Sequence, residues 1–335
     1  MNIKKAILAS MIVSSMFVTL AGPAFAGAEA AGGKKQEQAS SNSVQFDKKV
    51  AANLQKAVNQ FAGKEIKLKF ENAFKHPFDL ATVPSADELY EVNFKPGTGE
   101  LINIKGIQSL DKVSKDDQKE LLNKLKGMYA KKAYAFHKEV QITQSYDKGK
   151  VYSTLYLLEG KDFVISWIKY PQEQSKNKNY IGAAVIQVDK NELEPKLLKT
   201  AADAVKTALD QEFEVKKAEL GYYGGIKVTK NDTWKLKGDH ITLAVEAKTG
   251  KIEYVYDVAR KQADKAVTEK EVKEIAAPIA KKLFHMDIQG LEVKWDKSAR
   301  DFRFVQNKET KMSVALDDDK NVVYMFSGLR MLMEK

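Results

Sequence analysis

The hydrophobic period of the chain changes between residues 195 and 258. Apolar residues recur every three or four positions up to Leu209, which predicts an amphipathic helix. Downstream of this helix the period becomes two, in strand-length segments bounded by Gly, Asp and Lys. In the segment HITLAVEA, Ile241, Leu243 and Val245 alternate with polar neighbours. This alternation predicts an antiparallel sheet with one covered face, and the preceding helix is the natural cover.

The same plan, a helix followed by short strands, recurs along the chain. In the last copy, Thr268 and Glu271 have the spacing of a capping box at a helix start. Pro278 should bend or shorten that helix, because proline removes one backbone donor. The repetition predicts an α+β fold made of tandem units, each with one helix packed on a small antiparallel sheet. The four expected units are 46–110, 114–190, 195–259 and 267–330.

Each expected unit closes with a similar hairpin, of which EAKTGKIEYVYDV is the clearest example. A turn of this length between twisted strands needs one residue at positive φ, which glycine adopts at no steric cost. Gly99 and Gly250 are the expected turn glycines in two units. Asn191 and Asn321 would take that conformation in the other two.

The N-terminal residues predict export from the cell. Lys4 and Lys5 precede a short apolar run and an A-x-A site that ends at Ala26, so residues 1–26 read as a secretory signal peptide. The alternative, a retained membrane anchor, needs about 20 apolar residues, and the run is shorter. Residues 27–45 are rich in Ala, Gly, Ser and Gln without an apolar period, which predicts a flexible leader. No membrane span is expected after removal of the signal.

Composition narrows the chemistry. The chain has no cysteine, which excludes disulfides, thiol catalysis and thiolate metal sites. The formal charge is +10, and it falls to +8 once the two lysines of the signal are removed. Most lysines lie among acidic residues, as on an ordinary solvated surface. The alternative interpretation is weak attraction to an anionic wall polymer.

The segment WKLKGDHITLAVEAKTGKIEYV resembles the PepSY domain, through its aromatic-led strand, alternating strand and Thr-Gly turn after an Ala-rich helix. The resemblance covers 195–259 well and 268–328 less well. The secreted, repeated layout is similar to the YcdB/YcdC-type proteins of Gram-positive bacteria. This resemblance implies a non-catalytic protein outside the cytoplasm that modulates a protease. We expect no protease domain after residue 330, so such regulation would act on a separate protease.

No pattern indicates a catalytic residue, a cofactor or a metal ion. The four histidines are far apart in sequence and form no H-E-x-x-H motif, although a zinc site could arise if the fold brought them together. They are His76, His137, His240 and His285. The turn from Asp317 to Asp319 crowds carboxylates and could bind calcium, but it lacks the spacing of an EF-hand loop. An ordinary exposed turn is the simpler interpretation.

Aromatic residues are the candidates for a binding surface. The expected binding residues are Trp234, Tyr254, Tyr256 and Trp295. Trp234 and Trp295 hold similar places in successive units, which also fits a core role. Basic and aromatic residues do not interleave as in nucleic-acid-binding modules, so nucleic acid is not an expected partner.

The sequence therefore predicts a secreted or cell-wall-associated, non-enzymatic protein. It would bind a protein or peptide, with an extracellular protease as one candidate, through an exposed sheet face or edge strand. A wall-polymer (polyanion) binding protein is the alternative. A metal-dependent hydrolase is the third hypothesis.

Overall fold

The computed structural model describes Val44 and residues 46–171, 179–224, 232–264 and 267–328. The expected signal peptide, 1–26, lies outside the described residues, as does all of the expected leader except Val44. Among the described residues, no helix combines the length and the apolar character that crossing a membrane requires.

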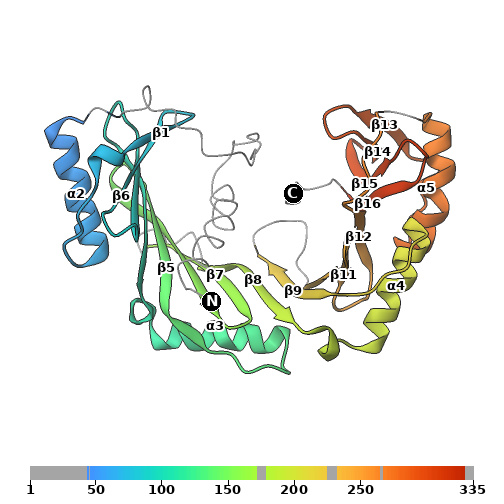
Figure 1. Ribbon diagram of the computed structural model, residues 1–335, viewed down its shortest axis with the longest axis horizontal. Helices are drawn as coiled ribbons and strands as arrows, with labels where there is room; N and C mark the ends of the chain where they lie inside the picture. Colours follow the sequence, from blue (N-terminus) through green and yellow to red (C-terminus); the bar gives the residue numbers. More distant parts are fainter. Residues whose placement is uncertain (1–43, 45, 172–178, 225–231, 265–266, 329–335) are drawn as a thin grey trace. The chain divides into compact units, whose positions relative to one another are not determined.

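Along the described chain, each of four α-helices is followed by four strands (Figure 1). The helices are α2 (Lys48–Ala62), α3 (Lys115–Met128), α4 (Pro195–Leu209) and α5 (Glu269–Leu283). The first eight strands are β1 (Phe74–His76), β2 (Leu80–Pro84), β3 (Tyr90–Phe94), β4 (Leu101–Ser109), β5 (Phe136–Asp147), β6 (Lys150–Gly160), β7 (Phe163–Lys169) and β8 (Tyr180–Val188). The others are β9 (Lys217–Tyr223), β10 (Thr233–Lys237), β11 (Ile241–Glu246), β12 (Ile252–Asp257), β13 (Glu292–Asp296), β14 (Asp301–Gln306), β15 (Glu309–Leu316) and β16 (Val322–Ser327). Short 3₁₀ helices are η2 (Phe70–Asn72), η3 (Leu110–Lys112) and η5 (Lys190–Glu192).

The sixteen strands form one antiparallel sheet, so the prediction of tandem units with separate small sheets is wrong. Strands β1 to β12 follow chain order, and β16, β15, β14 and β13 complete the sheet. The junctions are the β4–β5, β8–β9 and β12–β16 pairs. The edge of a sheet exposes unpaired backbone N–H and C=O groups, and joining neighbouring sheets pairs them. The edges that remain are β1 and β13. The boundaries of the four units remain a prediction.

The four helices pack on the same face of the sheet. Helices α3, α4 and α5 share one buried cluster with strand residues that include Ile142 of β5 and Leu220 of β9. Gly106 of β4 is paired with Ile142 and therefore points to the same face. A Cβ atom at Gly106 would lie 3.0 Å from the Phe61 ring of α2. Helix α2 therefore covers this face as well.

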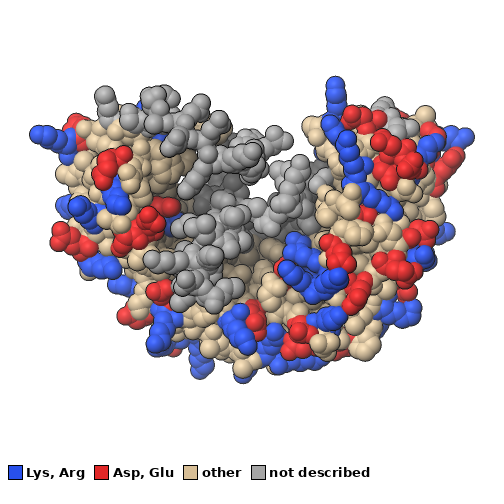
Figure 2. All heavy atoms as spheres, viewed as in Figure 1, with Lys and Arg blue, Asp and Glu red and all other residues tan. Residues whose placement is uncertain are grey.

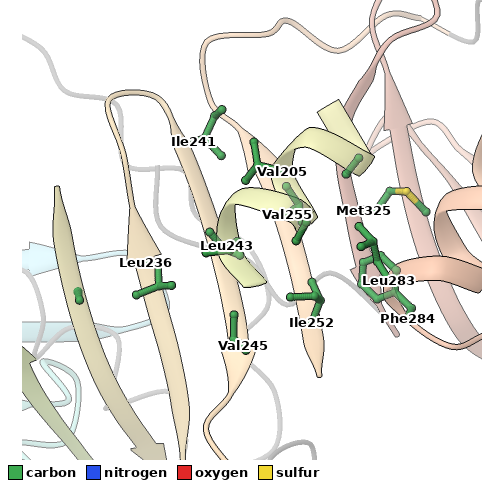
Figure 3. Close-up of a cluster of buried hydrophobic side chains, with 14 of the residues drawn as sticks. Val205, Leu236, Ile241, Leu243, Val245, Ile252, Val255, Leu283, Phe284 and Met325 are labelled. Atoms are coloured by element: carbon green, nitrogen blue, oxygen red, sulfur yellow. The ribbon is translucent and has the colours of Figure 1, made fainter. Parts of the chain in front are cut away.

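The packing of α4 on the sheet illustrates this core. Val205 points from α4 toward Leu243 of β11 and Val255 of β12 (Figure 3). All three side chains are fully buried, and the two strand residues face each other in the register. Burial of an aliphatic side chain of this size contributes about 1.5–3 kcal/mol, so this contact is a substantial part of what attaches the helix to the sheet.

The alternation predicted for β11 is confirmed, since Ile241 and Val245 both lie in the helix-covered cluster. The partner strand β12 departs from simple alternation. Val245 pairs with Ile252, but the residue before Val245 pairs with Tyr254, so Glu253 is an extra residue in the ladder. This bulge turns Ile252 toward the helices and Tyr254 toward the opposite face.

The predicted start of α5 is confirmed. The Thr268 hydroxyl accepts from the Glu271 N–H, and the Glu271 carboxylate accepts from the Thr268 N–H at 2.8 Å. The expected shortening at Pro278 does not occur, because α5 continues to Leu283. Loss of one backbone bond is offset by burial on the sheet side, where Ala280 is fully buried.

The turn residues agree only in part with expectation. Gly99 and Gly250 have φ values of 71° and 74°. Asn191 instead lies in the 3₁₀ helix η5, which removes the need for a left-handed residue there. In the last hairpin Lys320 has a φ of 66°, and Asn321 does not take the left-handed conformation.

Candidate functional site

A pocket of about 480 Å³ lies on the helix-covered side of the sheet. We call it the α3–α4 pocket. Its lining comes from the segment 128–131 after α3, the start of α4 with the residues before it, the β11–β12 turn, and Leu220 and Trp234 of the sheet. A pocket of this volume is large enough for a small ligand or for a large side chain of a partner.

The floor of the α3–α4 pocket is an apolar row across three strands. Leu220 of β9 pairs with Trp234 of β10, which pairs with Val245 of β11. Leu220 and Val245 are buried in the core, whereas the Trp234 ring is half-buried. The Tyr129 ring meets the Trp234 ring edge-on, with 6.0 Å between centroids. The pocket thus presents an aromatic pair above well-packed aliphatic side chains.

The wall formed by segment 128–131 is held by hydrogen bonds. The Tyr129 hydroxyl donates to the Glu192 carbonyl at 3.3 Å, and the Tyr134 hydroxyl donates to the Tyr129 carbonyl at 2.7 Å. Lys132 donates to the Gln187 carbonyl at 2.8 Å and forms an ion pair with Glu192 at 3.5 Å. Burial raises the pKa of Tyr134 to about 12, with smaller contributions from Tyr129 and Glu192. Its hydroxyl therefore remains a donor at neutral pH.

Helix α3 also contacts β9, a strand that follows α4 in the chain. The Lys124 ammonium lies 3.9 Å from the centroid of the Tyr222 ring of β9 and 4.0 Å from an Asp232 carboxylate oxygen. Cation–π contacts of this kind contribute about 0.5–1 kcal/mol at partly exposed sites. The end of α3 is thus anchored beside the pocket floor.

The rim of the pocket carries charges of both signs. Lys131 pairs with Glu194 at 3.3 Å, and their side chains are 57% and 73% exposed, so water and salt screen this pair. Lys196 and Lys248 also line the pocket. A rim of this kind leaves hydrogen-bonding groups available around an apolar centre, as in protein-binding sites.

The β11–β12 turn forms the remaining wall and is internally bonded. The Gly250 N–H donates to the Glu246 carbonyl at 2.9 Å, and the Thr249 hydroxyl donates to the Glu246 carboxylate at 2.5 Å. An added Cβ at Gly250 would meet no heavy atom within 4 Å. Glycine is therefore favoured at this position by its φ of 74° and not by a lack of space.

The fold brings only part of the predicted site together. Trp234 and Gly250 line the α3–α4 pocket. Trp295 is on β13, where its ring lies 4.7 Å from that of Phe302. Gly99 lies in the β3–β4 turn, where an added Cβ would be 2.7 Å from Val50 of α2. These last two residues are remote in the sheet order from the pocket strands.

Tyr254 and Tyr256 lie on the face opposite to the helices. The Tyr254 ring stacks on Phe326 with 4.9 Å between centroids, and the Tyr256 ring meets Tyr324 edge-on at 5.7 Å. Tyr254, Tyr324 and Phe326 are all buried. These tyrosines therefore form a structural cluster across β12 and β16, away from the pocket.

Pocket residues that sequence reasoning missed include Tyr129, Leu197 and Leu220. Tyr129 follows a helix, Leu197 lies in the first turn of the next helix, and Leu220 is one of many alternating strand residues. No short motif joins them, because they meet only through the pairing of β8 with β9. A contact prediction between the end of α3 and β10 would have been the necessary signal.

Other candidate sites have simple structural explanations. In the described parts of the chain, no group of three or more His, Asp or Glu residues is placed to hold a metal ion. The Asp317 carboxylate accepts from the N–H groups of Asp319 and Asn321, at 3.0 and 2.8 Å, so it closes its own turn. His240 contacts the buried Asp257 through Nδ1 at 2.8 Å. Among the described residues, no hydroxyl is hydrogen-bonded to this ring.

Comparison with known proteins gives no relative for this chain: no family model, no curated protein and no solved structure matches it. The fold and the pocket therefore define the protein only by its architecture. It has a large antiparallel sheet with helices on one face, and an aromatic pocket lies between two of these helices.

Proposed function

We propose that this protein is a secreted, non-catalytic binding protein that recognises a protein or peptide partner at the α3–α4 pocket. The observation that carries the proposal is the combination of an apolar floor at Trp234 and Tyr129 with a rim of both charges. The residues that contribute most of the binding energy in protein interfaces are often tryptophan or tyrosine, and a polar rim surrounds them. A large apolar side chain of the partner would enter the pocket and contact Trp234.

Different observations support the proposed location of the protein and the proposed class of its partner. The expected signal peptide supports a secreted or cell-wall-associated protein. The resemblance of 195–259 to PepSY domains makes an extracellular protease the first partner to test. The Thr-Gly turn that carries this resemblance forms one wall of the pocket. This placement supports a recognition role for the turn in addition to its structural one.

The test is affinity capture from the secreted proteins of the source organism, followed by quantification of each retained protein. Trp234→Ala should weaken binding of the partner by at least about 30-fold, since loss of a dominant interface residue costs about 2 kcal/mol or more. Trp295→Ala is the matched control, because Trp295 is also a half-buried strand tryptophan but lies outside the pocket. It should retain the partner to within about twofold.

A second variant separates loss of binding from loss of folding. Thr200 is a half-buried pocket residue on α4, so Thr200→Trp should fill the pocket without removing any core side chain. It should reduce capture as Trp234→Ala does while the urea midpoint of the protein stays near that of the wild type. Equal capture by all variants, or no protein captured by the wild type above background, would refute the proposal. If the wild-type protein captures a partner but leaves protease activity unchanged, only the role in protease regulation would be refuted.

A further inference from the structure

The outer side of α3 forms one wall of a second groove, of about 340 Å³, that is rich in lysine. Its cationic residues are Lys115, Lys119 and Lys126, which are all exposed. Leu122 and Tyr134 are half-buried and give the groove an apolar floor. We call this site the α3 lysine groove. It is distinct from the α3–α4 pocket, with which it shares no lining residue.

Helical geometry places the three lysines in one row. At about 100° per residue, Lys115, Lys119 and Lys126 fall within roughly 40° of one another around α3. Eleven residues at about 1.5 Å each give a row of about 16 Å. The acidic residues Asp116 and Glu120 fall on a different side of the helix by the same geometry. The groove therefore presents a line of positive charge along the helix axis.

The three lysines lack the ion pairs that their neighbours make. Lys131 and Lys169 pair with Glu194 and Asp117, at 3.3 and 3.1 Å. Within the described chain, no acidic group lies within ion-pair distance of Lys115, Lys119 or Lys126. Figure 2 shows acidic and basic side chains interspersed over the described surface in that view. Against this mixed surface, an unpaired row of lysines is a local excess of positive charge.

Two of these lysines are also unfavourable for the helix itself. Lys115 is the first residue of α3, where the helix macrodipole disfavours a cation. Lys115 and Lys119 are four positions apart, and like charges at this spacing destabilise a helix. An anionic ligand along the groove would relieve both effects. The stability of α3 therefore does not account for these two lysines.

We propose that the α3 lysine groove binds a linear polymer that carries repeated phosphate groups. A row of cations on a groove wall fits an extended chain, whereas a flat membrane surface would favour a broad patch. The lysines would contact successive phosphates, while Leu122 and Tyr134 would form the floor of the groove beneath the polymer. This inference goes beyond binding of a protein partner and does not depend on the α3–α4 pocket.

The test measures binding of labelled linear inorganic polyphosphate to the full-length mature protein by fluorescence anisotropy at several salt concentrations. Three phosphate contacts predict a slope of about −2 in a plot of log affinity against log salt, at roughly 0.7 per contact. The triple variant Lys115→Gln, Lys119→Gln, Lys126→Gln should lose about 100-fold in affinity, at about fivefold per lysine. Its slope should approach zero.

The matched control removes three exposed lysines of α5, in the variant Lys270→Gln, Lys281→Gln, Lys282→Gln. It changes the net charge equally and should keep affinity to within about threefold. Equal loss in both triple variants would show attraction to net charge and would overturn the proposal. If orthophosphate at the same phosphate concentration displaced the labelled polyphosphate, the proposal that the ligand is a linear polymer would be overturned. Tighter binding to phosphatidylglycerol vesicles, lost in the α3 variant, would assign the groove to a membrane instead.

Discussion

The buried carboxylate of Asp257 offers the sharpest test of how the sheet is held to its helices. Its side chain is 2% exposed and accepts from Gln211 Nε2 and His240 Nδ1, each at 2.8 Å. The Ala259 N–H donates to it at 3.0 Å, and Arg260 Nε lies 3.3 Å away. One carboxylate thus joins the end of β12 to the segment after α4.

Arg260 extends this network to two further elements. It donates to the carbonyl of Leu209 at the end of α4, at 3.1 Å, and to that of Val322 on β16, at 2.7 Å. Substitution Asp257→Ala would leave the partly buried guanidinium without its counter-ion and Gln211 without its acceptor. Loss of one partner of a buried pair typically costs about 3–5 kcal/mol. We expect a cost in this range for Asp257→Ala.

The variant Asp257→Asn isolates the charge. Burial alone would raise the pKa of Asp257, but the hydrogen bonds from Gln211, His240 and Ala259 outweigh it and hold the pKa below its usual value. A depressed carboxyl pKa stabilises the fold above the unfolded pKa of about 3.9, and this contribution is lost as the pH falls through the folded pKa. The stability gap between wild type and Asp257→Asn should therefore narrow below about pH 3.9.

Urea unfolding followed by tryptophan fluorescence measures these differences. With a slope of about 2–3 kcal/mol/M, the expected cost of Asp257→Ala lowers the midpoint by roughly 1–2.5 M. The control is Asp203→Ala, which removes an exposed pair with Lys199 on α4 and should cost no more than about 0.5 kcal/mol. A cost below about 1 kcal/mol for Asp257→Ala would refute the assignment of a structural role to this network.

Two further predictions concern a pair of glycines and a second buried acid. Gly99→Ala should cost about 1–3 kcal/mol more than Gly250→Ala in urea unfolding, because only at Gly99 would the new Cβ lie 2.7 Å from Val50. Equal costs would mean that φ alone governs both turns. Burial raises the pKa of Asp301 despite the 3.0 Å hydrogen bond from Tyr324, so stability falls as the pH rises from the unfolded pKa through the folded one. Asp301→Asn should therefore gain stability relative to wild type between pH 4 and pH 7, measured by the same assay; a relative loss over that range would contradict the sign.

Local features of the fold were predictable because they depend on neighbouring residues. The capping box of Thr268 and Glu271 and the alternation of β11 are set within a few positions of sequence. The bulge at Glu253 was not predictable from alternation, because an extra ladder residue leaves no period of its own. Its effect is large, since it decides that Tyr254 faces away from the helices.

The pairing of strands from different repeats could not be read from the sequence. A strand such as β8 has the same pattern whether it closes a small sheet or pairs with β9. Whether such a strand closes a small sheet or pairs with the next repeat depends on the stability of the whole chain. Each junction removes two open edges and extends the apolar core. The shared cluster beneath α3, α4 and α5 shows how far that core extends in the described residues.

The continuity of the sheet explains why the sequence indicated Trp234 as a candidate binding residue but did not indicate the pocket around it. The tryptophan stands on β10, whereas Tyr129 belongs to the segment after α3, which precedes β5. Pairing of β8 with β9 brings these regions together, and the Lys124 contact with Tyr222 fixes α3 beside β9. In separate units, Trp234 would face only its own helix, and the aromatic pair would not exist. The α3–α4 pocket therefore lies at the junction between β8 and β9, so the proposed recognition there would require the continuous sheet and not a single repeat.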